Sequence, residues 1–586
     1  MIKVFKNFKR KDYFIMLTCI VLMVWQVWLE LKIPEFMSKV TRLVQTGSGD
    51  FGEILLQGGF MLLCSFGSLL TAVVIGYFAA LLSASLSLKL RSKIFNKVES
   101  FGMEEIKKFS TSSLITRTTN DVTQIEMTVA MGLQMMIKAP IMAIWAVSKI
   151  LDKSIEWSAL TGIAVFILLA TITTILIIVV PRFERVQKLT DKVNGVTGEN
   201  LSGIRVIHAF NAEEFQEERF DEVNSKLTKT QLFNQRMFSI LQPVMMLINH
   251  SLTLAIYFVG ALLISEAGML DKITLFSDMV VFSSYGMQVI MSFLMLAMIF
   301  MMVPRAQISA KRINEVLDEE NSIKDGTFGG NTSLKGTVEF KNVSFKYPDA
   351  DENVIENISF TANQGETVAF IGSTGSGKST LINLVPRFYD VTEGEILVDG
   401  VNIKDYKEEA LHNKIGYIPQ KAVMFTGTVK ENVTYGDNGK GTIDDKTVEE
   451  ALKVAQAYDF VNKMDGKTKA HIARGGTNVS GGQKQRLAIA RAVARKPEIY
   501  IFDDSFSALD YKTDLALRQE LKKYTKDATS LIVAQRIGTI VNADKIVVLD
   551  KGKCVGIGTH KELLDTCEVY KEIALSQLSK EELENA

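Results

Sequence analysis

Residues Gly372 to Ser379, in the stretch ETVAFIGSTGSGKST, have the types and spacing of a phosphate-binding loop. They fit the pattern G-x-x-x-x-G-K-[ST], in which backbone N–H groups wrap phosphate oxygens ahead of a helix. Lys378 would reach the β and γ phosphates of a nucleotide, and Ser379 would bind Mg²⁺. A chance glycine-rich loop is the weaker alternative, because the buried strand and the helix start that the motif requires flank it here.

Two adjacent carboxylates, Asp503 and Asp504, end a second apolar run, EIYIF. At the carboxyl end of a parallel strand beside the phosphate loop, Asp503 would hold Mg²⁺ through water. Asp504 follows at a position where a general base for an attacking water could stand. The two carboxylates therefore predict a site that hydrolyses a nucleotide.

A second phosphate-binding surface is predicted by NVSGGQKQRLAIARA, Asn478 to Ala492. Ser480, Gly481 and Gly482 offer a hydroxyl group and unobstructed backbone at a helix start. A single site does not need two such surfaces, so we expect this one to close on a nucleotide held by another copy of the domain. A membrane-anchored phosphotransferase, with one active site, would have no use for it.

Together these motifs resemble those of the ATP-binding cassette (ABC) transporters, specifically the exporter half-transporters with six spans and one cassette. The resemblance covers essentially the whole chain and includes YIPQ, the family signature VSGGQ (Val479 to Gln483), YIFDD and SALD (Ser507 to Asp510). It implies ATP and Mg²⁺ as cofactors, catalytic roles for Asp504, Gln535 and Lys378, and metal ligation by Ser379, Gln420 and Asp503. The ATP-binding residues that it implies are Tyr347, which would stack on adenine, and Gly372, Ser373, Thr374, Gly375, Ser376, Gly377, Lys378, Ser379, Thr380, Gln420, Ser480, Gly481, Gly482, Gln483 and Asp510.

Three positions depart from the family pattern. Asp504 replaces a Glu, which withdraws the carboxylate by about 1.5 Å, and a misplacement of that size can cost on the order of 100-fold in rate. A shifted backbone that lets Asp serve as the base is the alternative. Gln535 replaces the switch His and cannot carry a proton near neutral pH. Arg474 replaces a Glu that is common before the signature, with a consequence that the sequence does not reveal.

Because the signature is intact while two catalytic positions are weakened, the chain resembles one half of a heterodimeric exporter. In the degenerate site it would supply Lys378, Asp503, Asp504 and Gln535. In the competent site, a different half-transporter with Glu and His at the catalytic positions would face Ser480 to Gln483. A homodimer with two slow sites is the alternative.

The chain that carries these residues has two parts of different composition, one rich in apolar runs and one rich in charged residues. Charges cancel at 66 basic against 66 acidic residues, which suggests no nucleic-acid partner. A bilayer span needs roughly 20 apolar residues, and long apolar stretches occur only before about residue 305. The third predicted span is interrupted by Lys138 and Lys149. The six predicted spans are about 13–34, 54–88, 127–151, 157–181, 237–265 and 279–304.

Basic residues before the first span, such as Lys9 and Arg10, predict a cytoplasmic amino terminus. Six crossings return the cassette to the same side, so we expect a multi-pass protein of the cell (inner or plasma) membrane. Residues 1–310 would form an α-helical transmembrane domain of the ABC exporter fold, and 311–336 a flexible linker. Residues 337–586 would form an α/β P-loop NTPase domain with an antiparallel β subdomain and a helical signature subdomain. The resemblance implies coupling loops near 109–126 and 199–220.

In the last span, Met287, Met291, Met295, Met298 and Met302 recur at spacings of four, four, three and four, on one helical face. Such a flexible, polarizable face suits varied apolar partners, although helix packing or lipid contact would explain it equally well. For Glu30 and Lys149, near the span ends, snorkelling to the interface is the favoured interpretation. The candidate substrate cavity comprises Gln26, Gln134, Lys138, Asn249, Gln288, Met287, Met291, Met295 and Met298, with Glu30 and His250 as further polar candidates.

A mixed cavity of this kind favours amphiphilic drugs, with lipids or hydrophobic peptides as alternatives. The predicted function is ATP-driven export of amphiphilic or hydrophobic compounds by alternating access, within the lipid bilayer and with a second half-transporter. A different class, an ATP-gated regulator or channel that does not pump, is also compatible with weakened catalytic residues.

Overall fold

The computed structural model describes residues 2–46, 51–151, 155–436 and 439–577. Their contacts divide the chain into two units, each described here by itself. The first comprises Met1–Glu99 with Ser110–Glu319, and the second comprises Ser100–Phe109 with Glu320–Ala586.

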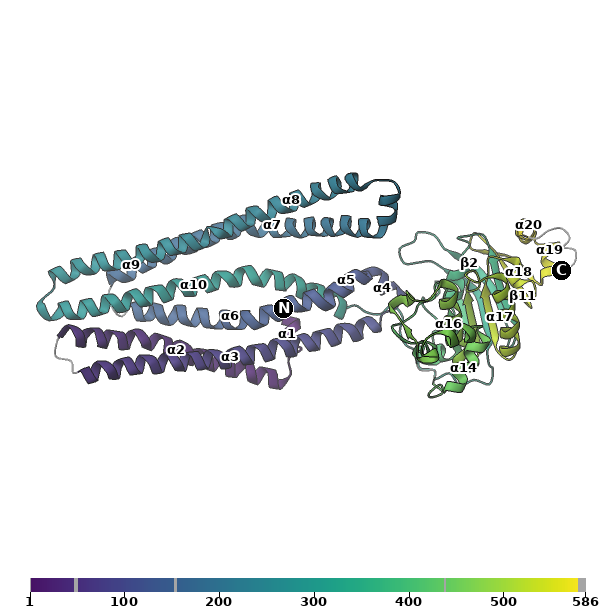
Figure 1. Ribbon diagram of the computed structural model, residues 1–586, viewed down its shortest axis with the longest axis horizontal. Helices are drawn as coiled ribbons and strands as arrows, with labels where there is room; N and C mark the ends of the chain where they lie inside the picture. Colours follow the sequence, from purple (N-terminus) through teal and green to yellow (C-terminus); the bar gives the residue numbers. More distant parts are fainter. Residues whose placement is uncertain (1, 47–50, 152–154, 437–438, 578–586) are drawn as a thin grey trace. The chain divides into compact units, whose positions relative to one another are not determined.

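The first unit consists of long helices (Figure 1). Within the described residues, six helical segments are long and apolar enough to cross a membrane, which confirms the expected number. They have 37 to 55 residues each, whereas about 20 residues suffice for a bilayer core. The segments therefore extend well beyond the apolar stretches read from the sequence. Their helices are α2 (Arg10–Thr46), α3 (Phe51–Glu99), α5 (Thr111–Thr116) with α6 (Val122–Leu151), α7 (Ile155–Ala209), α8 (Glu213–Ser239) with α9 (Leu241–Glu266), and α10 (Met269–Leu317); the short α1 (Ile2–Phe5) precedes them.

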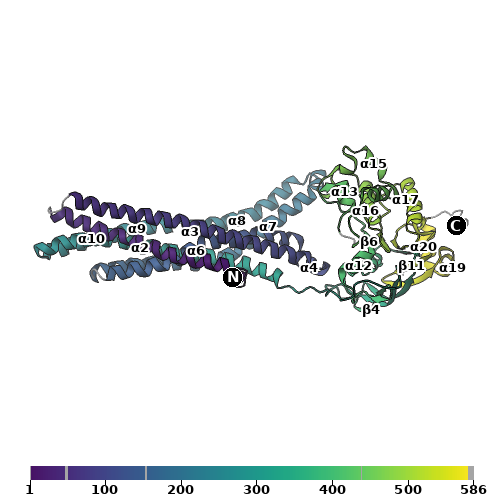
Figure 2. The same ribbon diagram turned by 90° about the horizontal axis from the view of Figure 1, so that it is seen from below.

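Helices α2 and α3 lie side by side, as Figure 1 and Figure 2 both show. The apolar core of the unit forms where α2, α6, α7, α9 and α10 meet. There the Trp157 ring lies 5.4 Å from that of Phe282, and the buried Tyr285 hydroxyl donates to the carbonyl of Leu31 at 3.1 Å. The hydroxyl thereby fixes α10 against α2.

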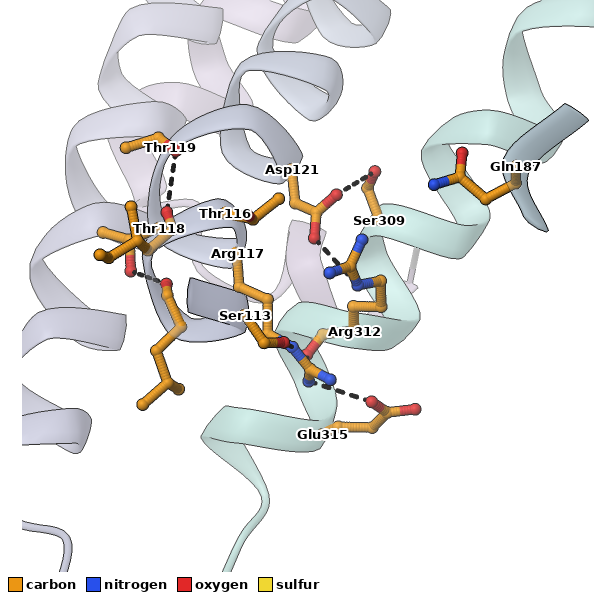
Figure 3. Close-up of polar contacts among 12 residues, drawn as sticks. Ser113, Thr116, Arg117, Thr118, Thr119, Asp121, Gln187, Ser309, Arg312 and Glu315 are labelled. Carbon is orange, nitrogen blue, oxygen red and sulfur yellow. Dashed lines mark hydrogen bonds and ion pairs between the residues drawn. The ribbon is translucent and has the colours of Figure 1, made fainter. Parts of the chain in front are cut away.

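Between α5 and α6 the chain continues through a π-helical turn, Arg117–Asp121, without leaving the helix. Asp121 accepts a hydrogen bond from Ser309 at 2.9 Å and lies 3.4 Å from the Arg312 guanidinium, both on α10 (Figure 3). A π turn is rare and commonly marks a functional position in a helix. Here it places a buried carboxylate against α10.

Two boundaries differ from those expected. The first coupling segment was expected near 109–126, but residues 111–126 belong to the helix formed by α5, the π turn and α6, from which Arg117 and Asp121 contact α10. The separate short helix is α4 (Met103–Phe109), which groups with the second unit. Glu105 fixes this helix by accepting hydrogen bonds from the backbone N–H groups of Gly102 and Ser322.

The transmembrane domain was expected to end at residue 310, yet α10 continues to Leu317. Ala306, Ala310, Ile313 and Val316 are all buried, so the buried apolar face of the helix continues beyond residue 304, the predicted end of the span.

The linker expected to be flexible is attached to the cassette. Residues 326–328 donate backbone hydrogen bonds to the carbonyls of Asp405 and Tyr406, and the Phe328 ring packs edge-on against Tyr406 at 4.9 Å. A Cβ atom at Gly326 would lie 2.2 Å from the Asp405 carbonyl oxygen, so the close approach requires glycine. One of the glycines that suggested flexibility, Gly326, thus permits a tight contact.

The second unit has the α/β architecture expected of the cassette. A six-stranded sheet has the order β12-β11-β3-β10-β9-β6, in which only β12 is antiparallel to its neighbour. Its strands are β3 (Thr367–Gly372), β6 (Ile415–Ile418), β9 (Ile499–Asp503), β10 (Thr529–Val533), β11 (Lys545–Asp550) and β12 (Lys553–Gly558).

An antiparallel sheet of order β2-β1-β4-β5 packs against the parallel sheet through Phe340, Phe360 and Phe370. Its strands are β1 (Val338–Phe345), β2 (Ile355–Ala362), β4 (Glu393–Val398) and β5 (Val401–Asn402); β7 (Gly427–Thr428) pairs separately with β8 (His471–Ile472).

Helices of a second apolar cluster pack on β6 and β9 and form the helical part of the cassette. The helices of the unit are α11 (Lys378–Asn383), α12 (Glu408–Lys414), α13 (Val429–Val433), α14 (Asp445–Val454), α15 (Tyr458–Lys463), α16 (Gly481–Ala494), α17 (Tyr511–Tyr524), α18 (Ile537–Ile540), α19 (His560–Thr566) and α20 (Glu568–Gln577), with short 3₁₀ turns at Lys467–Lys469 and Arg474–Gly476.

Candidate functional site

The order of the parallel strands explains how distant motifs meet. Strands β3, β10, β9 and β6 are consecutive neighbours, so their carboxyl ends lie along one edge of the sheet. The phosphate loop follows β3, Gln535 follows β10, Asp503 ends β9, and Gln420 follows β6. Residues separated by more than 100 positions in the sequence therefore line one site.

The phosphate loop has the tight geometry that its glycines predict. Gly372 has φ +156°, and a Cβ atom there would lie 2.0 Å from the Leu549 carbonyl oxygen, which no larger residue could tolerate. Lys378 begins α11 and donates to the carbonyls of Gly372 (2.9 Å) and Ser373 (2.7 Å). Burial lowers the pKa of the Lys378 ammonium, while the nearby carboxylates of Asp504 and Asp503 oppose this. The ammonium is thus held in the loop beside two acidic groups.

Two of the three expected metal ligands, Ser379 and Asp503, are in contact. The Ser379 hydroxyl donates to Asp503 Oδ1 at 2.6 Å, and such oxygen ligands are those that Mg²⁺ prefers. Burial raises the pKa of the Asp503 carboxyl; the hydrogen bond from Ser379 opposes this, and the charge of Asp504 adds to it. The protein compensates the charge of the buried Asp503 carboxylate only poorly, and a bound cation would supply the missing positive charge.

Asp504 is held between two amides. Its Oδ2 atom accepts from Gln535 Nε2 at 2.7 Å and from Gln420 Nε2 at 3.1 Å. Its backbone has φ +47°, in the left-handed region, and its N–H donates to the Val533 carbonyl. Two of the three positions that depart from the family pattern, Asp504 and Gln535, are therefore in direct contact. With its nitrogen on Asp504, Gln420 would offer its other amide atom, Oε1, to a metal.

The expected adenine-stacking residue, Tyr347, lies beside the phosphate loop, with its hydroxyl 3.1 Å from the Thr380 hydroxyl. The Lys107 ammonium of α4 lies 4.4 Å from the centre of the Tyr347 ring, and Tyr389 meets that ring edge-on at 5.3 Å. Sequence reasoning missed Lys107 and Tyr389, because neither belongs to a motif. Only the position of Lys107 in a charged segment between two spans could have drawn attention to it.

The signature starts α16 with a capping box. The Ser480 hydroxyl accepts from the Gln483 N–H at 3.3 Å, and the Gln483 side chain accepts from the Ser480 N–H at 2.8 Å. A Cβ atom at Gly482 would lie 3.3 Å from the Ala508 carbonyl, next to Asp510, which caps α17. The signature therefore contacts the SALD segment of its own cassette, and Arg474 before it is exposed.

Among the residues that the structure describes, two cavities of the helical unit are lined by predicted substrate residues. The larger, about 630 Å³, is lined by the expected Asn249, Met287, Met291 and Met298, and also by His250 and residues of α9 that no motif indicated. The smaller, about 340 Å³, is lined by Lys138, Met287, Gln288, Met291 and Met295. Gln26 and Gln134 belong to neither lining.

Glu30 and Lys149, which were expected to snorkel to the interface, both have protein partners in the structure. Glu30 Oε1 accepts from Lys138 at 2.8 Å, from Gln26 at 3.0 Å and from Ser68 at 3.0 Å. Lys149 pairs with Glu35 at 2.8 Å. Each charge thus has a partner of opposite sign on a neighbouring helix, as charges between membrane helices commonly do.

Comparisons with known proteins agree with this architecture. The family models described as "ABC transporter transmembrane region" and "ABC transporter" match residues 14–293 and 355–507. An uncharacterized ABC transporter ATP-binding protein of Mycobacterium tuberculosis is 38% identical over 531 residues, 90% of each chain. One of Bacillus subtilis is 34% identical over 96% of each chain.

A Staphylococcus aureus protein proposed to be a multidrug export ATP-binding/permease protein is 33% identical over 85% of each chain. The solved structure of a bacterial Atm1-family ABC exporter with ATP bound superposes with a TM-score of 0.84, at 23% identity, over 97% of this chain and 100% of the other. The chain therefore belongs to the ABC transporter family, as an exporter-type half-transporter whose transmembrane domain is fused to its ATP-binding domain.

Proposed function

We propose that this chain exports amphiphilic or hydrophobic compounds, drugs or lipids, as the degenerate-site half of a heterodimer. ABC half-transporters work as dimers in the membrane and couple ATP hydrolysis to transport. The proposal of a degenerate site rests on the contact of Asp504 with Gln535 and Gln420, together with the intact signature in the same chain. The resemblance to a protein proposed to export multiple drugs supports the class of substrate.

In this proposal the residues of the site bind the nucleotide and its metal ion but do not promote hydrolysis. Lys378 and the loop N–H groups would hold the phosphates, and Ser379, Asp503 and Gln420 would hold Mg²⁺. Mg²⁺ would neutralise phosphate charge there. Asp504 is short for a base and is engaged by two amide donors, so it would keep nucleotide bound rather than promote its hydrolysis.

The opposite composite site would do the hydrolysis. There Ser480, Gly481, Gly482 and Gln483 would face the nucleotide held by a different half-transporter, which contributes Glu and His. Closure of the two cassettes would switch the helices from inward-facing to outward-facing, and hydrolysis at the competent site would reset them.

The test is to purify the chain with and without a candidate partner half-transporter and to measure ATPase rates for wild type, Asp504→Ala and Ser480→Ala. The proposal expects an active pair that keeps most of its rate in Asp504→Ala and loses it in Ser480→Ala. Brisk hydrolysis by the chain alone, abolished by Asp504→Ala, would instead show a homodimer with a working base.

Transport by the pair must also be followed against a concentration gradient in vesicles. A pair that hydrolyses ATP but lets solute pass only downhill would be a regulator or channel, and the export proposal would fail.

A further inference from the structure

The smaller cavity of the helical unit combines an ion pair with a flexible apolar wall. Four of its lining residues are methionines, Met142 on α6 and Met287, Met291 and Met295 on α10. Thioether side chains adapt to ligands of different shape. The same cavity is lined by Glu30 and Lys138, which lie within predicted spans and whose side chains are 23% and 22% exposed. A ligand there would meet both an apolar surface and two opposite charges.

The ion pair is organised by three helices. Lys138 of α6 donates to Glu30 of α2, and Ser68 of α3 donates to the same carboxylate oxygen, as does Gln26 from the preceding turn of α2. The carboxylate is thus fixed before any ligand arrives. Charged groups between membrane helices are costly unless they are paired, and they commonly mark substrate or ion pathways.

Gln288 adds an unsatisfied acceptor to the cavity. Its side-chain oxygen is buried and has no hydrogen-bond partner in the part of the chain that the structure describes. A buried acceptor without a donor is unfavourable. An N–H group of a ligand would satisfy it.

Charge balance decides which class of ligand fits. A ligand with one charge that separates Glu30 from Lys138 would leave the other residue without a counter-charge in a largely apolar cavity, which is strongly unfavourable. A ligand with both charges can exchange partner for partner, its cation on Glu30 and its anion on Lys138. An ammonium with N–H donors can bind Gln288 as well, which a quaternary ammonium cannot.

We propose that this cavity binds a zwitterionic amphiphile, with its primary ammonium on Glu30 and Gln288, its anion on Lys138 and its apolar chain on the methionines. The inference rests on the proposed export function, whose substrate class it narrows. The zwitterion could be a lipid with a phosphate group or an acylated amino acid with a carboxylate group, which share this chemistry.

The test measures equilibrium binding, without ATP, to the full chain in nanodiscs, together with its partner if one is required. The probes share one acyl chain: lysophosphatidylethanolamine, lysophosphatidylcholine, lysophosphatidylglycerol and Nε-lauroyl-lysine. We expect at least one of the two primary-ammonium zwitterions to bind about tenfold or more tightly than the choline and glycerol lipids, since only these zwitterions satisfy all three polar groups. Comparison of the two distinguishes the lipid source from the amino-acid source.

The variant is the double substitution Glu30→Gln with Lys138→Met, which removes both charges and keeps the site neutral. The matched control is Glu35→Gln with Lys149→Met, which removes the second ion pair, at 2.8 Å, on the same two helices. The first should abolish the headgroup preference and the second should preserve it, with folding of both checked by thermal unfolding.

A preference that survives loss of Glu30 and Lys138, or equal binding of all probes to wild type, would overturn the inference. Export of amphiphilic drugs without any headgroup preference would refute this site while leaving the proposed function intact. Zwitterion binding that depends on the pair, without ATP-driven export, would support the site and refute the proposed function.

Discussion

Asp504 and Gln535 are best understood as a unit. Both amide donors to Asp504 bind the same oxygen, Oδ2, at 2.7 Å and 3.1 Å. The Gln535 amide can donate to this oxygen, but a glutamine cannot take up a proton or become positively charged as a histidine can. The residues that would make the site slow are therefore a matched pair rather than two separate substitutions.

The double substitution Asp504→Glu with Gln535→His should raise the ATPase rate of the chain purified alone by about tenfold or more. The longer side chain moves the carboxylate outward by about 1.5 Å, toward the water that a base must reach, and histidine restores a group that can be charged. Steady-state phosphate release measures the effect.

Asp504→Asn with Gln535→His is the control, because it carries the histidine but no base, and its rate should stay at the wild-type level. An unchanged rate in the Glu/His variant would mean that slow turnover has another cause.

At the scale of elements, helix α4 brings a cation to the expected adenine platform. Lys107 lies 4.4 Å from the centre of the Tyr347 ring and 5.6 Å from that of Tyr389. A cation over an exposed aromatic ring contributes about 0.5–1 kcal/mol, and it would hold Tyr347 in place for stacking. Lys107→Met should therefore weaken ATP binding about two- to fivefold, as measured by fluorescent-nucleotide titration.

Lys108→Met is the matched control, since the Lys108 ammonium lies instead over Phe109, at 5.8 Å. Equal losses of affinity in both variants would show a general effect of charge on α4, not a contact with the nucleotide platform.

The π turn before α6 should matter for stability. Asp121→Asn keeps the shape of the side chain but removes its charge opposite Arg312, at 3.4 Å, in a contact where the Asp121 side chain is 9% exposed. Disturbing such a buried charged contact costs about 1–3 kcal/mol, so the midpoint of thermal unfolding in detergent should fall.

Lys3→Met removes an exposed pair, Lys3–Asp318, with side chains 63% and 56% exposed, and should leave the midpoint unchanged because such pairs are well solvated. If Asp121→Asn also leaves the midpoint unchanged, the contact between Asp121 and Arg312 does not stabilise the protein.

Helices and loops could be predicted from the sequence where a short local pattern of residues determines them. Apolar run lengths specified the six spans, and the strand, glycine turn and helix around Lys378 specified the phosphate loop. The end of α10 was misjudged because its buried face continues through Ala310 and Ile313 among charged residues. The linker was misjudged because the glycine at 326 serves a close contact with Asp405, which only the tertiary structure reveals.

At the scale of the whole molecule, the order of the parallel strands predicts which nucleotide motifs come into contact. No comparable rule predicts the contacts between helices of the first unit. Parallel strand order brings Ser379 and Asp503 together although they are 124 residues apart. Glu30 and Lys138 are 108 residues apart, and no rule of sequence fixes the rotation of α2 relative to α6. Their pairing, and with it the second cavity, required the structure.

If one site of the dimer retains ATP and the other hydrolyses it, the assembled dimer should release its nucleotides unequally. After a single turnover with excess Mg²⁺, about one ATP per dimer should remain intact and bound, because the site with Asp504 and Gln535 closes without an effective base. Rapid filtration followed by separation of ATP from ADP measures this fraction. The Asp504→Glu with Gln535→His variant should shorten the lifetime of the retained ATP by about 10- to 100-fold, a range set by the cost of misplacing a base. Complete conversion to ADP by the wild-type dimer would instead show that both sites hydrolyse, so that Asp504 acts as a base through its left-handed backbone at φ +47°.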